Sequence, residues 1–229
     1  AGNDLLFDVK LCEQGRNFSN KIWNAFRLMD GWQVADIDTP GHNKVAVRWF
    51  ESDFNEALKQ LEDQFSRYRI SDALMTVYKL IWDDFCSWYL EIIKPKYGQP
   101  IEAWTLGQTK MFFEKLMKVL HPFMPFISEE LWHGIADREE RDCIIVADWP
   151  TAGEVDKEMV LGANVAYQVV TNIRKIRQQK NIPFKEQFPV YLRARDLNVY
   201  YPFADIIRKL TNIESVNLTE EKIPGAMGF

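Results

Sequence analysis

Apolar residues recur every three to four positions from the start of the chain to about residue 136, which is the period of an amphipathic α-helix. Glycine and proline separate these periodic segments. We therefore expect residues 1–150 to form a helical bundle. Its helices are predicted near Asp8–Met29, Val45–Tyr68, Asp72–Ile93, Ala103–Leu120 and Glu129–Ile135.

The pattern changes after residue 150, where one long helical period is followed by two short strand-like segments with a helical segment between them. Residues 151–229 are therefore expected to form a small α+β subdomain. Its predicted elements are a helix over Lys157–Gln179, a strand over Phe188–Ala194, a helix over Ala204–Leu210 and a strand over Glu214–Leu218. The predicted fold class is mainly α, a helical bundle with a small C-terminal α+β appendage.

The first helix divides into two faces on a helical wheel at about 100° per residue. The apolar face, which we expect in the core, carries Phe18, Ile22, Ala25, Phe26 and Met29. The opposite face and its flanks carry arginines, amides, a lysine and an indole, namely Arg16, Asn17, Asn20, Lys21, Trp23, Asn24 and Arg27.

This polar face has the chemistry that single-stranded RNA requires. Amides and guanidinium groups read base edges, cations meet phosphates, and an aromatic ring stacks on an unpaired base at about 1–3 kcal/mol per base. The pattern alone leaves open an ordinary polar face whose Trp23 packs under another helix.

A second candidate surface is the segment from Thr171 to Lys185, which carries five positive charges and no acid. An apolar stripe of Val165, Val169, Ile173 and Ile176 is predicted to face the core. This would leave the cations facing outward, either as phosphate contacts or as a solvated basic face. The cations are Arg174, Lys175, Arg177 and Lys180.

Composition narrows the possible functions. The 229 residues are 47% hydrophobic, which suffices for a packed core, and a formal charge of −5 argues against bulk, sequence-independent nucleic-acid binding. The sequence predicts no membrane span and no signal peptide, so we expect a soluble, cytoplasmic protein. The three cysteines are far apart and predict neither disulfides nor a zinc site, and common catalytic and phosphate-loop motifs are absent.

The ends of the chain suggest a part of a longer protein. The chain opens at Ala1 without a methionine and stops in the apolar stretch GAMGF. We therefore interpret its function as that of one part within a larger molecule.

Three ordered motifs carry a family resemblance. GRNFSNKIWNAFRL (15–28), LIWDDFCSWYLEIIKP (80–95) and LHPFMPFISEELW (120–132) resemble the landmarks of the anticodon-binding domain in valyl-, isoleucyl- and leucyl-tRNA synthetases. NIRKIRQQKNIP (172–183) is similar to the helix and turn that follow this bundle in valyl enzymes. The first and third motifs look most like the valyl branch, although Phe26 departs from the small residue usual at its position.

The resemblance implies that the polar face of the first helix meets the anticodon of valine tRNA, through Asn20, Lys21, Asn24 and Arg27 foremost. It also implies a non-catalytic, monomeric part without a cofactor of its own, attached in cis to an enzyme that uses ATP and magnesium and edits mischarged tRNA. Two alternatives stay open. One is the matching domain of an isoleucyl or leucyl enzyme, and the other is a helical protein-interaction module with an apolar patch in place of the polar face.

Overall fold

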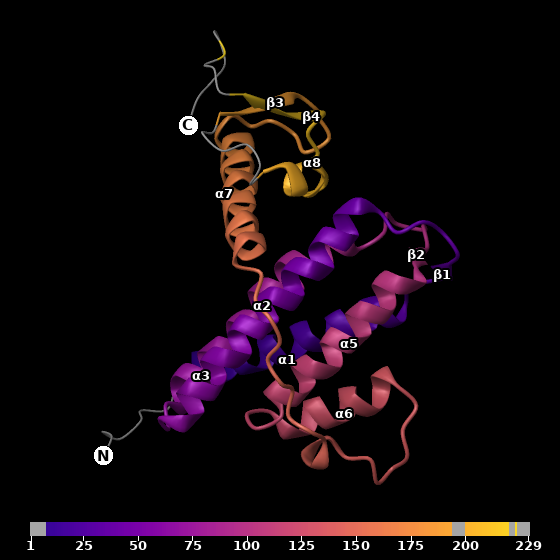
Figure 1. The fold of residues 1–229 in the computed structure, drawn as a ribbon, viewed down its shortest axis with the longest axis vertical. Helices are drawn as coiled ribbons and strands as arrows, with labels where there is room; N and C mark the ends of the chain where they lie inside the picture. Colours follow the sequence, from indigo (N-terminus) through magenta and orange to yellow (C-terminus); the bar gives the residue numbers. More distant parts are fainter. Residues whose placement is uncertain (1–7, 194–199, 220–222, 224–229) are drawn as a thin grey trace.

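The computed structural model describes residues 8–193, 200–219 and 223. Figure 1 shows a helical bundle in its first part, as the periodicity predicts. The α-helices of this part are α1 (Val9–Asp30), α2 (Gly41–Ser66), α3 (Ile70–Lys79), α4 (Leu90–Ile93), α5 (Ala103–Leu120) and α6 (Pro125–Ile135). Four of the five predicted helices thus correspond to one helix each.

The predicted helix over Asp72–Ile93 consists of three segments in the structure. A π-helix, η1 (Leu80–Tyr89), joins α3 to α4. The wider turns of a π-helix shift the side-chain period, and such segments are frequent at functional sites. Here η1 buries Leu80, Ile81, Phe85 and Tyr89 and lies between α1 and α2.

Two helices begin four residues earlier than predicted, each because of a proline. Pro40 precedes α2 with φ −59°, and Pro125 occupies the first turn of α6, where its missing N–H costs nothing. Ser128 lies inside α6, where its hydroxyl donates to the carbonyl of Met124. The segment before α2 contains β1 (Val34–Ala35), which pairs in parallel with β2 (Ile101–Glu102).

The centre of the bundle is an aromatic cluster around Phe50 of α2. Its ring centroid lies 4.9 Å from that of Tyr89, 5.0 Å from Phe112 and 5.4 Å from Phe85. The Tyr89 hydroxyl is satisfied by Thr109, at 2.9 Å between the two oxygens. The buried apolar residues form one contiguous cluster that continues from here into the second part of the chain.

The second part has the predicted order of helix, strand, helix and strand. Its elements are α7 (Lys157–Gln179), β3 (Pro189–Arg193), α8 (Ala204–Thr211) and β4 (Ser215–Thr219), and the short 3-10 helices η2 (Ile144–Val146) and η3 (Tyr201–Phe203) lie before α7 and α8. Strands β3 and β4 pair in parallel with Val190 opposite Val216, and α8 lies between them in the sequence. Ala194, the last residue of the predicted strand, is outside the described residues.

Helix α7 rises from α2 in Figure 1 and is fixed there by aromatic contacts. The ring of Tyr167 stacks on Trp88 of η1, with centroids 3.9 Å apart, and meets Trp49 of α2 edge-on at 5.2 Å. The chain leading into α7 is held by Asn55, whose side chain donates to the carbonyl of Glu154 and accepts from the N–H of Gly153. The second part is therefore packed firmly on α2 and η1.

Candidate RNA interface

Helix α1 presents its polar face to solvent, as the wheel predicts. Asp8 caps the helix, because its carboxylate accepts from the N–H of Lys10 at 2.8 Å. Four residues of the predicted core face are buried and Phe26 is half-buried. The residues of the opposite face are all exposed, namely Arg16, Asn17, Asn20, Trp23, Asn24 and Arg27.

These exposed polar side chains have no partner within the described part of the chain. None of the two arginines and three asparagines makes a side-chain hydrogen bond or an ion pair there. Trp23 is 39% exposed and contacts Phe26, with ring centroids 6.0 Å apart. Leu28, 40% exposed, lies beside this face and outside the predicted set. The face therefore offers donors, acceptors and apolar surface to a ligand.

Lys21 lies at the edge of this face and is half-buried. Its amine donates to the Ser87 hydroxyl at 2.8 Å and lies 4.0 Å from the centroid of the Trp82 ring. Both partners belong to η1. Lys21 therefore places a positive charge at the junction of α1 and η1.

The second predicted surface begins on the other side of the same π-helix. Arg174 of α7 is exposed, its guanidinium carbon is 5.8 Å from the Trp88 ring centroid, and one of its nitrogens donates to the carbonyl of Leu210 at 3.2 Å. Trp88 follows Ser87, the partner of Lys21, in the sequence. Lys175 of α7 and Lys180, which follows its last residue, are also exposed, so outward cations continue from Arg174 to the end of the helix.

Arg177 does not face solvent, and this prediction is wrong. It is only 5% exposed, and its guanidinium donates to the carbonyls of Pro183, Glu186 and Asn212 at 2.9, 2.9 and 3.1 Å. Its guanidinium carbon is also 4.6 Å from the ring centroid of Phe188. The buried stripe of α7 runs through Gly162, Ala163, Ala166, Val170 and Ile173 to Arg177, and only Ile173 belongs to the predicted stripe. Arg177 thus holds the turn after α7 and the turn after α8 together through its buried side chain.

The unusual Phe26 is accommodated by a glycine on the neighbouring helix. A Cβ atom built on Gly134 of α6 would lie 2.9 Å from the tip of the Phe26 ring, closer than real contacts allow. The ring also lies against Phe113, with centroids 6.3 Å apart. The pairing of Phe26 with Gly134 therefore keeps α6 close to α1 without disturbing the polar face.

Two carboxyl groups, those of Asp53 and Asp84, lie near Tyr167. Burial and the neighbouring Asp84 carboxyl raise the pKa of Asp53 to about 7, and burial also raises the pKa of Asp84. Lys79 forms an ion pair with Asp84 at 2.6 Å. The Tyr167 hydroxyl is buried without a hydrogen-bond partner, and burial raises its pKa well above the usual value. Three groups with raised pKa values, those of Asp53, Asp84 and Tyr167, therefore lie near one another where α7 packs on the bundle.

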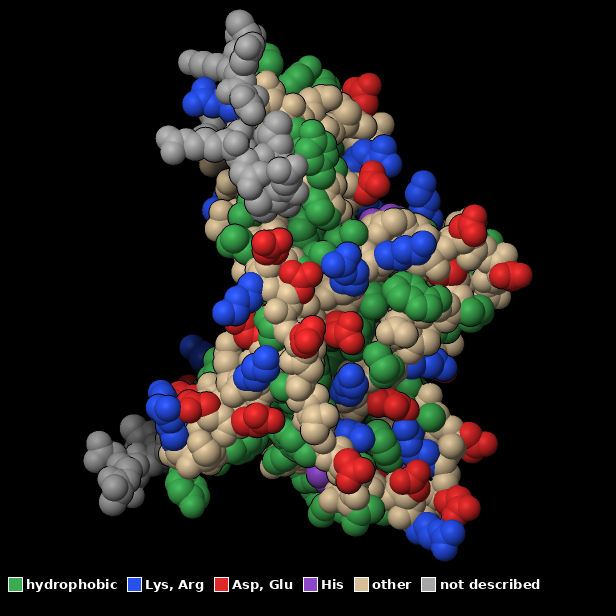
Figure 2. Space-filling view, in the orientation of Figure 1, with side chains coloured by type: hydrophobic (Ala, Val, Ile, Leu, Met, Phe, Trp, Pro, Cys, Tyr) green, Lys and Arg blue, Asp and Glu red, His purple; other side chains and the backbone are tan. Residues whose placement is uncertain are grey.

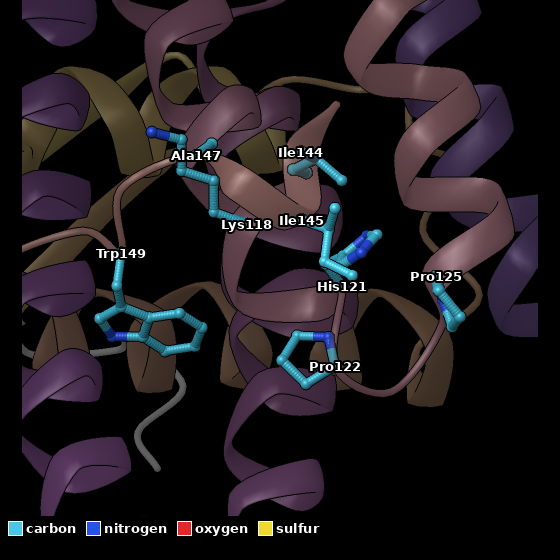
Figure 3. A pocket seen from close by; sticks show the side chains of 8 residues that line it. All are labelled: Lys118, His121, Pro122, Pro125, Ile144, Ile145, Ala147 and Trp149. Atoms are coloured by element: carbon cyan, nitrogen blue, oxygen red, sulfur yellow. The ribbon is translucent and has the colours of Figure 1, made fainter. Parts of the chain in front are cut away.

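A cavity of about 410 Å³ lies at the C-terminal end of α5, and Figure 3 shows the side chains that line it. His121 is held at its edge by Ser128, with 2.8 Å between Nδ1 and the hydroxyl oxygen. The walls are mostly apolar and include none of the predicted RNA contacts. They are formed by Lys118, His121, Pro122, Pro125, Ile144, Ile145, Ala147 and Trp149.

Within the described residues, no group of three or more His, Cys, Asp and Glu could hold a metal ion. No helix among them has the length and apolar character needed to cross a bilayer.

Comparison with known proteins gives the family. The model described as the anticodon-binding domain of tRNA ligase matches residues 47–192, which is more than half of the chain. The chain belongs to this family of anticodon-binding domains. Helix α1 precedes the matched residues, but the relatives described next cover it.

The relatives carry one name. The valine–tRNA ligases of Porphyromonas gingivalis and Phocaeicola vulgatus are 48% and 49% identical to the chain over its whole length. That of Bacillus thuringiensis is 33% identical over 85% of the chain. The chain spans only 26% of the length of the first two relatives.

Proposed function

We propose that the chain is the anticodon-binding part of a valine–tRNA ligase and recognises the anticodon loop of valine tRNA through the polar face of α1. The observation that supports this most directly is the row of exposed arginine and asparagine side chains that have no partner among the residues described by the structure. Because these polar groups are bonded only to water, they can bond to an RNA base without breaking a hydrogen bond within the described part of the protein.

Base reading is assigned to Asn20, Asn24 and Arg27, which follow one another along the centre of the exposed face. An asparagine amide can donate and accept at once, and this matches an adenine edge, while arginine donates to acceptor atoms. The middle and third anticodon bases of valine tRNA, adenine and cytosine, are the proposed targets. Arg16 and Asn17 extend the face toward the helix start, and Trp23 supplies a ring on which a base can stack.

Phosphate contacts are assigned to Arg174 and Lys175 on α7, to Lys180 directly after α7, and to Lys21 at the edge of α1. Of these residues, Lys21 contacts Ser87 of η1 and Arg174 lies against the next residue, Trp88. The proposal does not extend to Arg177, whose guanidinium is buried and donates through its two terminal nitrogens to three backbone carbonyls. The anticodon loop would then lie on α1 and its stem along α7.

The longer enzyme would join valine to its tRNA with ATP and magnesium and would hydrolyse mischarged tRNA, since both activities belong to the proposed class of ligase. We also propose that the protein is cytoplasmic and monomeric, and that residues 1–150 and 151–229 are two parts with separate tasks. The first part would read bases and the second would hold the backbone. The Tyr167 contact supports their acting as one body during binding.

The test is a titration of the chain with valine tRNA and with the same tRNA carrying another base at the middle anticodon position. Wild type is expected to prefer the unaltered tRNA, and Asn24→Ala to reduce this preference more than the total affinity. Arg174→Ala should weaken both complexes equally and flatten their salt dependence. Gln60→Ala, which removes an exposed amide on α2, is the matched control.

Equal losses for both tRNAs in Asn24→Ala would overturn the base-reading assignment. A preference for isoleucine or leucine tRNA would favour the related ligases. The name valine–tRNA ligase, which the three relatives described above share, argues against that outcome, and the exposed polar α1 face argues against a protein-interaction module at this site.

A further inference from the structure

Lys209 of α8 connects this helix to two segments of the bundle. Its amine donates to the carbonyl of Lys94, the residue after α4, at 3.0 Å, and lies 3.2 Å from Nε2 of His42, the second residue of α2. Both Lys209 and His42 are half-buried. Figure 2 shows histidine and basic side chains near one another at the surface where α8 approaches the start of α2. The contact between α8 and the bundle is therefore polar here and partly exposed.

His42 accepts a hydrogen bond from the Lys209 amine. Burial and the nearby charge of Lys209 lower the pKa of His42 to about 4, so the imidazole is neutral near pH 7. An ammonium group only donates, so Nε2 of His42 carries the lone pair and Nδ1 carries the ring proton. The amine of Lys209 therefore has two acceptors, Nε2 of His42 and the carbonyl oxygen of Lys94.

Two acceptors suit a neutral amine better than an ammonium group. An ammonium group has three N–H donors, and the third has no acceptor within the described part of the chain. A neutral amine has two N–H donors, which both acceptors satisfy, so its lone pair points away from them. Burial lowers the pKa of Lys209 to about 8, from 10.5 in an ordinary lysine. A lysine amine in such a setting is an activated nucleophile.

The charges around this contact are mixed and do not cancel the effect of burial. Acidic groups stabilise the protonated forms of Lys209 and His42, and basic groups destabilise them. For Lys209 the effect of burial is larger than that of any single charge. The charged groups that act on the two residues come from several elements, namely Glu91 of α4, Lys94 and Lys96 after it, Glu102 of β2, and Asp205 and Arg208 of α8.

We propose that Lys209 is a site of covalent acylation by small activated acyl groups, acyl phosphates or acyl thioesters, with His42 as a positioning residue, and that acylation loosens α8 from the bundle. The neutral amine attacks the acyl carbon and forms a C–N bond. The bond from this carbon to the phosphate oxygen or thiol sulfur breaks, and its electron pair leaves with that atom. The nitrogen gives one proton to the leaving group or to water. The resulting amide keeps a single N–H, so one of the two hydrogen bonds is lost.

The experiment treats the 229-residue chain with acetyl phosphate, and in a separate arm with acetyl-coenzyme A, and follows each lysine by peptide mass spectrometry. At pH 8 the neutral fraction of an amine with a pKa near 8 is roughly 100-fold that of an ordinary lysine, and its lower basicity reduces this advantage about tenfold. We therefore expect Lys209 to be acetylated about tenfold faster than the exposed Lys175 and Lys180. Its rate should level off above about pH 8, whereas theirs should keep rising to about pH 10.

Variants of His42 separate positioning from simple accessibility. His42→Ala removes one acceptor and part of the burial, so it should slow acetylation of Lys209 to the rate of Lys175 and shift its pH profile upward. His42→Gln, whose amide oxygen can accept from the amine, should recover part of the rate. Lys175→Arg is the matched control and should leave the rate at Lys209 unchanged. A faster reaction with only one donor still supports the proposal and identifies the class of that donor.

The loosening of α8 is measured by hydrogen exchange of residues 204–211 before and after acetylation. Exchange should quicken about tenfold in the acetylated wild type and stay unchanged in Lys209→Arg treated in the same way. Acetylation of Lys209 no faster than that of Lys175 in both arms would overturn the proposal, as would a wild-type rate and pH profile in His42→Ala. Unchanged exchange after acetylation would refute the loosening of α8.

Discussion

Replacing Arg177 tests whether a basic residue of α7 acts through folding or through RNA. Arg177→Ala removes three hydrogen bonds from a charged group to the carbonyls of Pro183, Glu186 and Asn212. A hydrogen bond of this kind contributes about 1.5–3 kcal/mol, but bonds from one group are not additive. Some of the released carbonyls will find water. We therefore expect the free energy of unfolding to fall by about 3–4 kcal/mol.

Arg177→Lys should recover only part of this loss. An ammonium group cannot reproduce the planar fork that reaches three carbonyls, nor the stacking on Phe188 at 4.6 Å. Urea unfolding followed by far-ultraviolet circular dichroism measures all variants. Lys175→Ala and Lys180→Ala are the controls, because both side chains are exposed and surface changes usually stay within about 0.5 kcal/mol. If Arg177→Ala unfolded like wild type but bound every tRNA more weakly, the buried assignment would be refuted.

Three further predictions concern the packing around α1 and α7. The folded protein binds the Asp53 proton more tightly than the unfolded chain does, because the pKa rises from 3.8 to about 7. Stability should therefore fall as pH rises through this range, and Asp53→Asn should flatten the slope in urea titrations at several pH values. Gly134→Ala should cost about 1–2 kcal/mol by overpacking Phe26, and adding Phe26→Ala should cost less than the sum of the single changes. Tyr167→Phe should unfold like wild type or slightly later, because it removes a buried hydroxyl without a partner, whereas Tyr167→Ala should lose about 3–5 kcal/mol.

The sequence predicts α1 well because its apolar residues are large and regularly spaced. Phe18, Ile22 and Met29 are buried, and the polar side chains opposite them are exposed. Once the buried residues of an amphipathic helix are known, the residues on its exposed face follow from the helical period. Lys21 is the exception on this helix, because its contact with η1 depends on a neighbour 66 residues away.

The same reasoning fails on α7 because its buried face is made of small residues. Gly162, Ala163 and Ala166 let α7 approach its neighbours closely, but they carry little weight on a hydrophobic wheel. Val165 and Val169 look more apolar, so the predicted stripe is rotated and Arg177 is placed outside. Its burial depends on carbonyls that become available only when the turns after α7 and α8 have formed.

The π-helix could not be predicted from the periodicity, since ten residues with an extra residue per turn still resemble an amphipathic helix. Its consequence is nonetheless central to the proposed site. Ser87 meets Lys21 of α1, and the next residue, Trp88, meets Tyr167 and Arg174 of α7. One irregular segment therefore links α1, to which base reading is assigned in our proposal, with α7, to which most of the proposed phosphate contacts are assigned.

The formal charge of −5 is compatible with RNA recognition because the proposed contacts are local. The proposed site combines a few cations on α1 and α7 with three asparagines, and the acidic excess lies elsewhere on the chain. About four phosphate contacts would give a salt dependence near −3 in logarithmic slope for a single strand, which is modest for a nucleic-acid-binding protein. Attraction of this size orients the tRNA without holding unrelated RNA tightly. Discrimination must then come from the uncharged amides of α1, whose contacts with bases are not screened by salt.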